Sequence, residues 1–227
     1  MLVCGYCFSQ KTVQNQRIWF SYIGQFKVSE KWGFNLEGQV RFDNHLEQSL
    51  QNAIRIGATY FLSSKESTTA GYTLVHTFNS SADKFYIENR LWEQYQLNKK
   101  WNNSKNTITH RFRLEQRWVE QSNSVNYQNR FRYLNRNLFH ITNFRSSNEE
   151  VYTIVQDEVF LTLGENKINS KVIDQNRFMI GLGLNYNNNT RIELGYVNQF
   201  TTSNSSNNVM NHVISVSLLQ SIDIGKH

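Results

Sequence analysis

Arginine recurs at alternate positions in two neighbouring stretches of this 227-residue sequence, 106–120 and 125–142, and Glu115 alternates with the arginines of the first stretch. Guanidinium groups at this density need carboxylates beside them, and arginine is well suited to pairing with carboxylates or binding anions. We expect Glu115 to bridge several of these arginines, with Glu88 as the second acid. The candidate site is therefore a charge cluster made of Arg111, Arg113, Glu115, Arg117, Arg130, Arg132, Arg136, Glu88 and Arg90.

The two stretches can form a hairpin with a short loop near 122–124. The expected register places Glu115 opposite Arg132 and Arg117 opposite Arg130. Burying arginines is costly unless they are paired. Further acids should therefore interleave with them, namely Glu37, Glu158 and Glu193. Two roles remain open for such a cluster: an ion-paired plug, or an arginine-lined passage that favours anions.

The histidines raise the alternative of a lipid-modifying hydrolase with a Ser/His pair. A nucleophile needs a base within hydrogen-bond reach and a third group that orients the base. The nearest local combinations are His212 with Ser215 or Ser217, and His140 with Thr142. His212 and Ser215 have opposite parity on a strand, and no nucleophile elbow surrounds either histidine. We therefore expect no catalytic residues.

Metal and phosphate sites are also weakly indicated. Asp43, His45 and Glu47 alternate at the edge of a loop, which a divalent ion could use, but the pattern is also typical of a solvated loop. The scattered glycines form no phosphate-binding loop, and we interpret them as marks of bulges and sheet curvature. We expect no metal and no cofactor.

The elements that would position these residues are β-strands. From Arg17 onward the sequence shows period-two alternation of apolar and polar residues. Segment 106–120, for example, places Phe112 and Leu114 on one face and Arg113 and Glu115 on the other. We expect strands near 17–28, 32–43, 53–63, 69–79, 86–98, 106–120, 125–142, 151–164, 175–187, 190–202 and 210–224.

Two architectures fit this alternation. A soluble barrel or sandwich turns its apolar face inward, whereas a membrane barrel turns it toward lipid and its charged face toward the interior. Long strands, arginine rather than lysine on the polar face, and aromatic residues near segment ends favour the membrane barrel. The aromatic residues are Trp19, Phe20, Trp32, Tyr60, Phe61, Trp92, Trp101, Trp118 and Tyr186, and the expected lipid-facing residues include Phe34, Leu36, Phe112, Leu114, Leu182, Leu184, Ile192 and Leu194.

The fold class is therefore all-β, a single antiparallel transmembrane β-barrel of 10–12 strands. Bacterial barrels usually have an even strand number, so the eleven recognised segments predict ten or twelve strands. Residues 1–10, which contain Cys4 and Cys7, have the character of a signal-peptide remnant, and 11–227 form the barrel domain. Proline is absent, as a strand ladder favours.

The formal charge of +6 does not indicate nucleic-acid binding. Lysines fall mainly between the apolar runs, and twelve of the thirteen arginines, all but Arg145, fall within them, so no contiguous basic patch exists. The expected location is the cell outer membrane. The expected partners are outer-membrane lipid, lipopolysaccharide and other outer-membrane proteins.

Six motifs span most of the sequence: VSEKWGFNLEGQVRFDN (28–44), ENRLWEQ (88–94), HRFRLEQRW (110–118), NRFRYLNR (129–136), DEVFLTLG (157–164) and DQNRFMIGLGLNYNNNTRIELGYVNQF (174–200). In their order and spacing they resemble an uncharacterised family of outer-membrane proteins that is common in Bacteroidetes and known only as a domain of unknown function. The resemblance implies a signal peptide and an outer-membrane barrel, and it supplies no activity.

Three functions follow from these observations. The principal hypothesis is a non-enzymatic outer-membrane barrel, structural or accessory to a larger assembly, whose interior is largely closed by the arginine and glutamate network. The alternatives are a narrow, porin-like channel that prefers anions and an outer-membrane lipid-modifying hydrolase. Ten to twelve strands lie between filled and open barrels, so the interior side chains decide.

Overall fold

The computed structural model of the chain describes residues 11–43, 46–80, 82–103, 105–121, 124–143, 149–164, 171–203 and 207–225. The predicted signal-peptide remnant, 1–10, and His45 lie outside this part. No helix in the described residues is long and apolar enough to cross a membrane.

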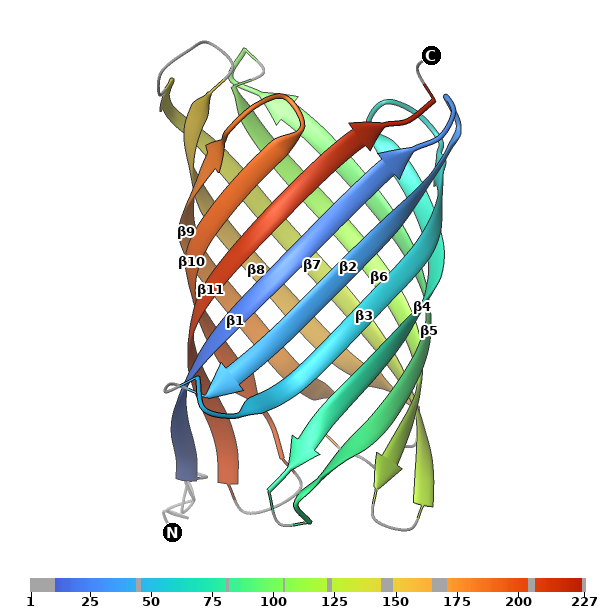
Figure 1. Ribbon diagram of the computed structural model, residues 1–227, viewed down its shortest axis with the longest axis vertical. Helices are drawn as coiled ribbons and strands as arrows, with labels where there is room; N and C mark the ends of the chain where they lie inside the picture. Colours follow the sequence, from blue (N-terminus) through green and yellow to red (C-terminus); the bar gives the residue numbers. More distant parts are fainter. Residues whose placement is uncertain are drawn as a thin grey trace, which may run out of the picture.

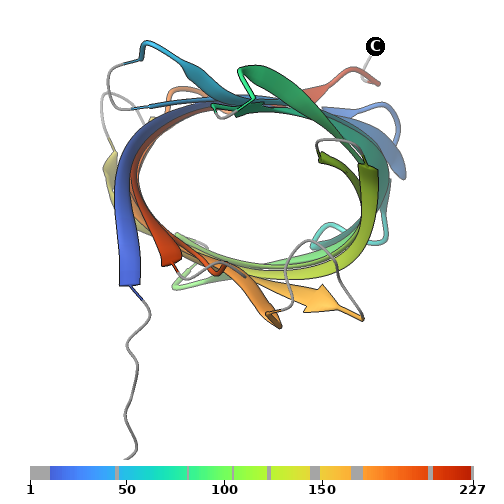
Figure 2. The same cartoon turned by 90° about the horizontal axis from the view of Figure 1, so that it is seen from below.

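The described residues form one closed β-barrel (Figures 1 and 2). Its strands are β1 (Lys11–Lys27), β2 (Trp32–Asp43), β3 (Ser49–Phe61), β4 (Glu66–Asn79), β5 (Lys84–Trp101), β6 (Asn106–Gln121), β7 (Ser124–Asn143), β8 (Glu150–Leu163), β9 (Ile173–Asn185), β10 (Thr190–Thr201) and β11 (Asn207–Asp223). Each of the eleven predicted segments corresponds to one of these strands, so the all-β barrel of 10–12 strands is confirmed.

The expectation of an even strand number is wrong, because the ring closes through a parallel pair. β1 pairs with β11 in parallel from Lys11 opposite Asn207 to Lys27 opposite Asp223, and the other neighbouring pairs are antiparallel. An odd number of strands can close only if one pair is parallel. The start of β1 and the end of β11 therefore lie at opposite rims of the barrel, as Figure 1 shows.

Alternation along each strand separates an interior face from an exterior face. In β6, Arg113 and Glu115 are 2% and 1% exposed, whereas Phe112 and Leu114, which alternate with them, are 40% and 42% exposed. Leu182, Ile192 and Leu194 on β9 and β10 are likewise exposed. The predicted facing is therefore confirmed: apolar side chains lie outside and charged ones inside.

The predicted register of the β6–β7 hairpin is wrong by two residues. Arg130 lies opposite Glu115, Arg132 lies opposite Arg113, and Gln121 lies opposite Ser124. The loop is thus shorter than expected, and each residue of β7 pairs with a residue two positions earlier in β6 than expected.

The glycines do not mark bulges in the described strands. Register shifts occur at Arg41/Phe42, His140/Thr142 and Phe160/Leu161. Gly57 and Gly71 instead lie opposite each other, and Gly71 lies opposite Trp92. A Cβ atom on Gly71 would lie 2.5 Å from Cζ2 of Trp92 and 2.3 Å from the carbonyl oxygen of Ile56. These glycines make room for an indole inside the barrel.

Two of the aromatic residues expected at the membrane interface are interior residues. Trp19 and Trp92 are 3% and 1% exposed. Trp19 belongs to an apolar cluster inside the barrel that also contains Tyr152, Ile154, Met179, Val197 and Val213. The alternation along the strand indicates the interior position of Trp92, because Trp92 is two residues from the interior Arg90. Trp32, by contrast, is 55% exposed and packs edge-on against Tyr60, with ring centroids 4.9 Å apart.

Candidate functional site: an arginine and glutamate network inside the barrel

Glu115 on β6 is the centre of the interior network. Its side chain is 0% exposed and accepts hydrogen bonds from Nε and Nη2 of Arg130 at 2.9 and 2.6 Å, and from Nη1 of Arg132 at 2.6 Å. Nη1 of Arg113 lies 3.9 Å away. One carboxylate therefore contacts three guanidinium groups, as the sequence predicted. These charge-assisted bonds are stronger than neutral ones.

Two further acids bridge arginines: Glu88, as expected, and Glu158 on β8. Glu158 Oε1 accepts from Arg111 at 2.6 Å and from Arg132 at 2.7 Å, and its Oε2 lies 3.9 Å from Arg177. Arg132 consequently links Glu115 and Glu158. The alternation along β8 places Glu158 on the interior face, and the register between β7 and β8 places it level with the arginines of β7. The sequence alone indicates the face but not the register.

Glu88 forms a separate unit with its own two arginines. It accepts from Nε and Nη2 of Arg90 at 2.6 and 2.9 Å, and from Nε of Arg117 at 2.5 Å. Arg117 also donates to Gln128. Both arginines belong to the predicted cluster. The members of the cluster were therefore predicted correctly, whereas the pairing of arginines with acids across β6 and β7 differs from the expected one.

Several contacts skip strands and so cross the interior. Arg136 on β7 reaches Glu193 on β10 at 2.5 Å, and Arg130 reaches Asp174 of β9 at 3.1 Å. Tyr152 on β8 also donates to Glu193, at 2.9 Å. Side chains that link non-adjacent strands fill part of the space that the ribbon leaves open in Figure 2.

Aromatic rings also contact the guanidinium groups of the network. Arg132 and Arg177 lie 4.5 and 4.7 Å from the ring centre of Phe160, and Arg113 lies 4.5 Å from that of Trp92. Cation–π contacts of this kind stabilise desolvated arginines. Sequence analysis missed Phe160 as a member of the site, although it has the same parity as Glu158.

All nine residues of the predicted cluster therefore lie inside the barrel and belong to this network. The other expected acids also pair with arginines: Glu37 with Arg55, Glu158 with Arg111 and Arg132, and Glu193 with Arg136.

The histidine candidates lie elsewhere. His212 faces outward, where its Nδ1 lies 2.5 Å from the hydroxyl of Tyr196 and its Nε2 lies 3.2 Å from Gln14. Ser215 faces the interior and is 7% exposed. His140 contacts Asn143. Within the described ranges, no three His, Cys, Asp or Glu side chains are grouped as metal ligands would be.

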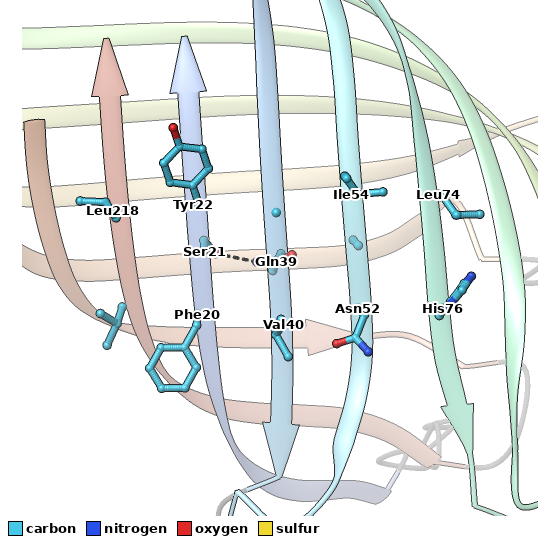
Figure 3. A pocket seen from close by; sticks show the side chains of 13 residues that line it. Phe20, Ser21, Tyr22, Gln39, Val40, Asn52, Ile54, Leu74, His76 and Leu218 are labelled. Atoms are coloured by element: carbon cyan, nitrogen blue, oxygen red, sulfur yellow. Dashed lines mark hydrogen bonds between the residues drawn. The ribbon is translucent and has the colours of Figure 1, made fainter. Parts of the chain in front are cut away.

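The outer wall also carries a shallow groove of about 600 Å³ over β1–β4 and β11 (Figure 3). Phe20, Tyr22, Val40, Ile54 and Leu74 line it, and Gly38 leaves its floor bare. Asn52 and His76, which are opposite each other in the β3–β4 register, add polar groups at one end.

Comparison with known proteins identifies a family but no characterised relative. No curated protein and no solved structure matches the chain. The family described as "Protein of unknown function (DUF2490)" matches residues 16–210, which is most of the barrel. The match therefore carries no activity and no site residues with it. On this evidence, the chain belongs to the DUF2490 family of proteins of unknown function.

Proposed function

We propose that this protein is a non-enzymatic integral barrel of the bacterial outer membrane, structural or accessory to a larger assembly, with an interior largely closed by its arginine and glutamate network. The observation that carries the proposal is the inverted distribution of side chains. Leu114, Leu182 and Leu194 are about half exposed on the outer wall, while Arg113 and Glu115 are buried inside.

A barrel in water gains stability by burying apolar side chains and exposing charged ones. This barrel does the reverse around its wall, which suits a lipid environment. Exposed apolar side chains occur on β3, β5, β6, β9, β10 and β11, so the apolar surface is not a single patch for one soluble partner. The sequence resemblance implies an origin in Bacteroidetes, and this origin is part of what we propose.

An accessory role is supported by a polar cluster within the outer wall. His110 Nδ1 lies 2.9 Å from the hydroxyl of Tyr133 and 3.4 Å from Nδ2 of Asn135. On the next two strands, Asn176 donates to Asp157 at 2.8 Å. Polar groups that face lipid are costly, and contact with another membrane protein would cover them.

Membrane fractionation of the native host tests the location. We expect the protein in the outer-membrane fraction, with a band on unboiled gels that shifts after heating, as folded barrels show. Recovery as a soluble periplasmic monomer would contradict the proposal. Crosslinking from a cysteine placed at Tyr133 tests the accessory role, with a cysteine at Leu194, three strands away on β10, as the control.

The second candidate is a narrow channel that prefers anions, and the surplus of interior arginines favours it. Planar-bilayer recording separates the two functions. A closed interior predicts no stable conductance steps. Steps with higher permeability to chloride than to potassium would support the channel.

A further inference from the structure

Several hydrogen-bond donors inside the barrel have no acceptor. Among the described residues, six buried side-chain atoms have no hydrogen-bond partner, and five of them are N–H donors. The donors are Nε1 of Trp19, Nε1 of Trp92, Nε of Arg41, Nε of Arg111 and Nη1 of Arg113. Buried donors are nearly always paired in folded proteins. Arginine and the indole group accept no hydrogen bond and stay protonated, so only an added acceptor can satisfy them.

The charge balance inside the barrel points the same way. The structure describes twelve arginines, all of them at interior positions by strand parity. Their ion pairs within the described chain use six carboxylates, namely Glu37, Glu88, Glu115, Glu158, Glu193 and Asp174. The interior is therefore short of negative charge as well as of acceptors.

The unpaired donors and the surplus of positive charge occur together around Trp19. Two arginines contact the ring of Trp19: Arg41 lies 4.1 Å and Arg177 lies 5.2 Å from the ring centroid. A similar arrangement surrounds Trp92, but there Arg55 has Glu37 as an ion-pair partner. Beside Trp19, the ion pair of the described residues is the longer contact between Arg177 and Glu158, at 3.9 Å, and Arg41 has none.

Arg41 has little compensation. Among the described residues its hydrogen-bond acceptor is Gln39, at 2.8 Å from Nη2, and it forms no ion pair there. The charges that act most strongly on it are other arginines, namely Arg177, Arg90, Arg17 and Arg132. The carboxylate partner of Arg177 among the described residues is Glu158, at 3.9 Å, which Arg111 and Arg132 already use at shorter distance. The amide oxygen of Gln175, in the orientation that its neighbours favour, also accepts from Arg177, but it carries no charge.

We infer that the barrel interior binds a small oxyanion, a phosphate or carboxylate group, between Arg41 and Arg177 beside Trp19. Guanidinium groups bind both kinds of oxyanion through paired N–H donors. Arg177 keeps 17% side-chain exposure and Arg41 is partly exposed, so an anion that enters the interior can reach them. The site depends only on the interior of the barrel and would exist whether or not the barrel lies in the outer membrane.

Inorganic phosphate is the probe for the first test. The barrel, folded in an uncharged detergent, is titrated with phosphate at constant ionic strength against chloride, and binding is followed by calorimetry. We expect saturable binding with one phosphate per barrel, and a rise of the thermal unfolding midpoint as phosphate increases, because a ligand of the folded state stabilises it. Absence of saturable phosphate binding to the unaltered protein would overturn the inference.

Matched variants locate the site. Arg41→Gln should weaken phosphate binding at least tenfold. Arg191→Gln removes the same charge from an interior position of β10 near the opposite rim, and it should leave the affinity within twofold. Arg41→Gln should still fold, because it relieves repulsion among arginines, and the heat-shifted band checks this. Equal loss of binding in both variants, or no loss in Arg41→Gln, would contradict a site at Trp19.

Discussion

Removal of the Glu115 carboxylate should destabilise the barrel more than removal of any one arginine bonded to it. Glu115→Ala deletes three hydrogen bonds to Arg130 and Arg132, at 2.9, 2.6 and 2.6 Å. Breaking a buried ion pair by removing one partner typically costs about 3–5 kcal/mol. Arg130 keeps Asp174 and Arg132 keeps Glu158, so we expect a loss near 3 kcal/mol.

The reverse change should cost less. Arg130→Met removes one cation from an interior with surplus cations, and Glu115 keeps its bond from Arg132 at 2.6 Å. Removal of one partner of a buried ion pair is costly mainly because it leaves the other charge without compensation. Here the Glu115 carboxylate keeps a partner, so the loss should be smaller than for Glu115→Ala. Glu115→Gln, which keeps the shape and one acceptor, should fall between Glu115→Ala and the unaltered protein.

Urea unfolding in detergent, followed by tryptophan fluorescence and by the heat-shifted band, measures these differences. A double-mutant cycle between Glu115 and Arg130 isolates their coupling. The cycle also tests the observed register, because the register expected from sequence places Arg132 opposite Glu115. If Glu115→Ala unfolds at the same urea concentration as the unaltered protein while Arg130→Met is severely destabilised, the network is not held by this acid. A hydrated, ligand-binding interior would then be the better interpretation.

Other substitutions test the wall and the interior packing. Leu182→Arg, at a position 54% exposed on the outer wall, should cost roughly 2–4 kcal/mol in urea unfolding from lipid vesicles if it lies near mid-membrane; a neutral effect would argue against a lipid-facing wall. Gly71→Val should abolish the heat-shifted band, because its Cβ would lie 2.3 Å from a backbone oxygen, whereas Gly38→Ala, which meets no atom within 4 Å, should fold normally. Normal folding of Gly71→Val would show that Trp92 and the backbone can move aside.

Much of the fold can be predicted from the sequence, because a strand repeats every two residues and each face of a barrel has its own environment. The eleven segments, the outward Phe112 and Leu114, and the inward Arg113 and Glu115 all follow from parity alone. The same parity indicates that Trp92 and Phe160 are interior. The aromatic character of Trp92 suggested the membrane interface instead, although its alternation with Arg90 indicates the interior.

The pairing of charges could not be predicted, because it depends on loop length and on distances across the ring. A loop shorter than expected moved β7 by two residues and placed Arg130 instead of Arg132 opposite Glu115. The contact from Arg136 to Glu193 joins strands that are distant in the sequence. No local spacing contains that information.

The sequence by itself determined which residues form strands and which face of each strand is charged, since both are set by alternation within a single segment. Only the tertiary structure decided how the ring closes. Whether eleven strands end in a parallel seam between β1 and β11 depends on long-range pairing of the first and last strands. That closure sets the width of the interior, and so determines which arginines share a carboxylate and which, like Arg41, face other arginines.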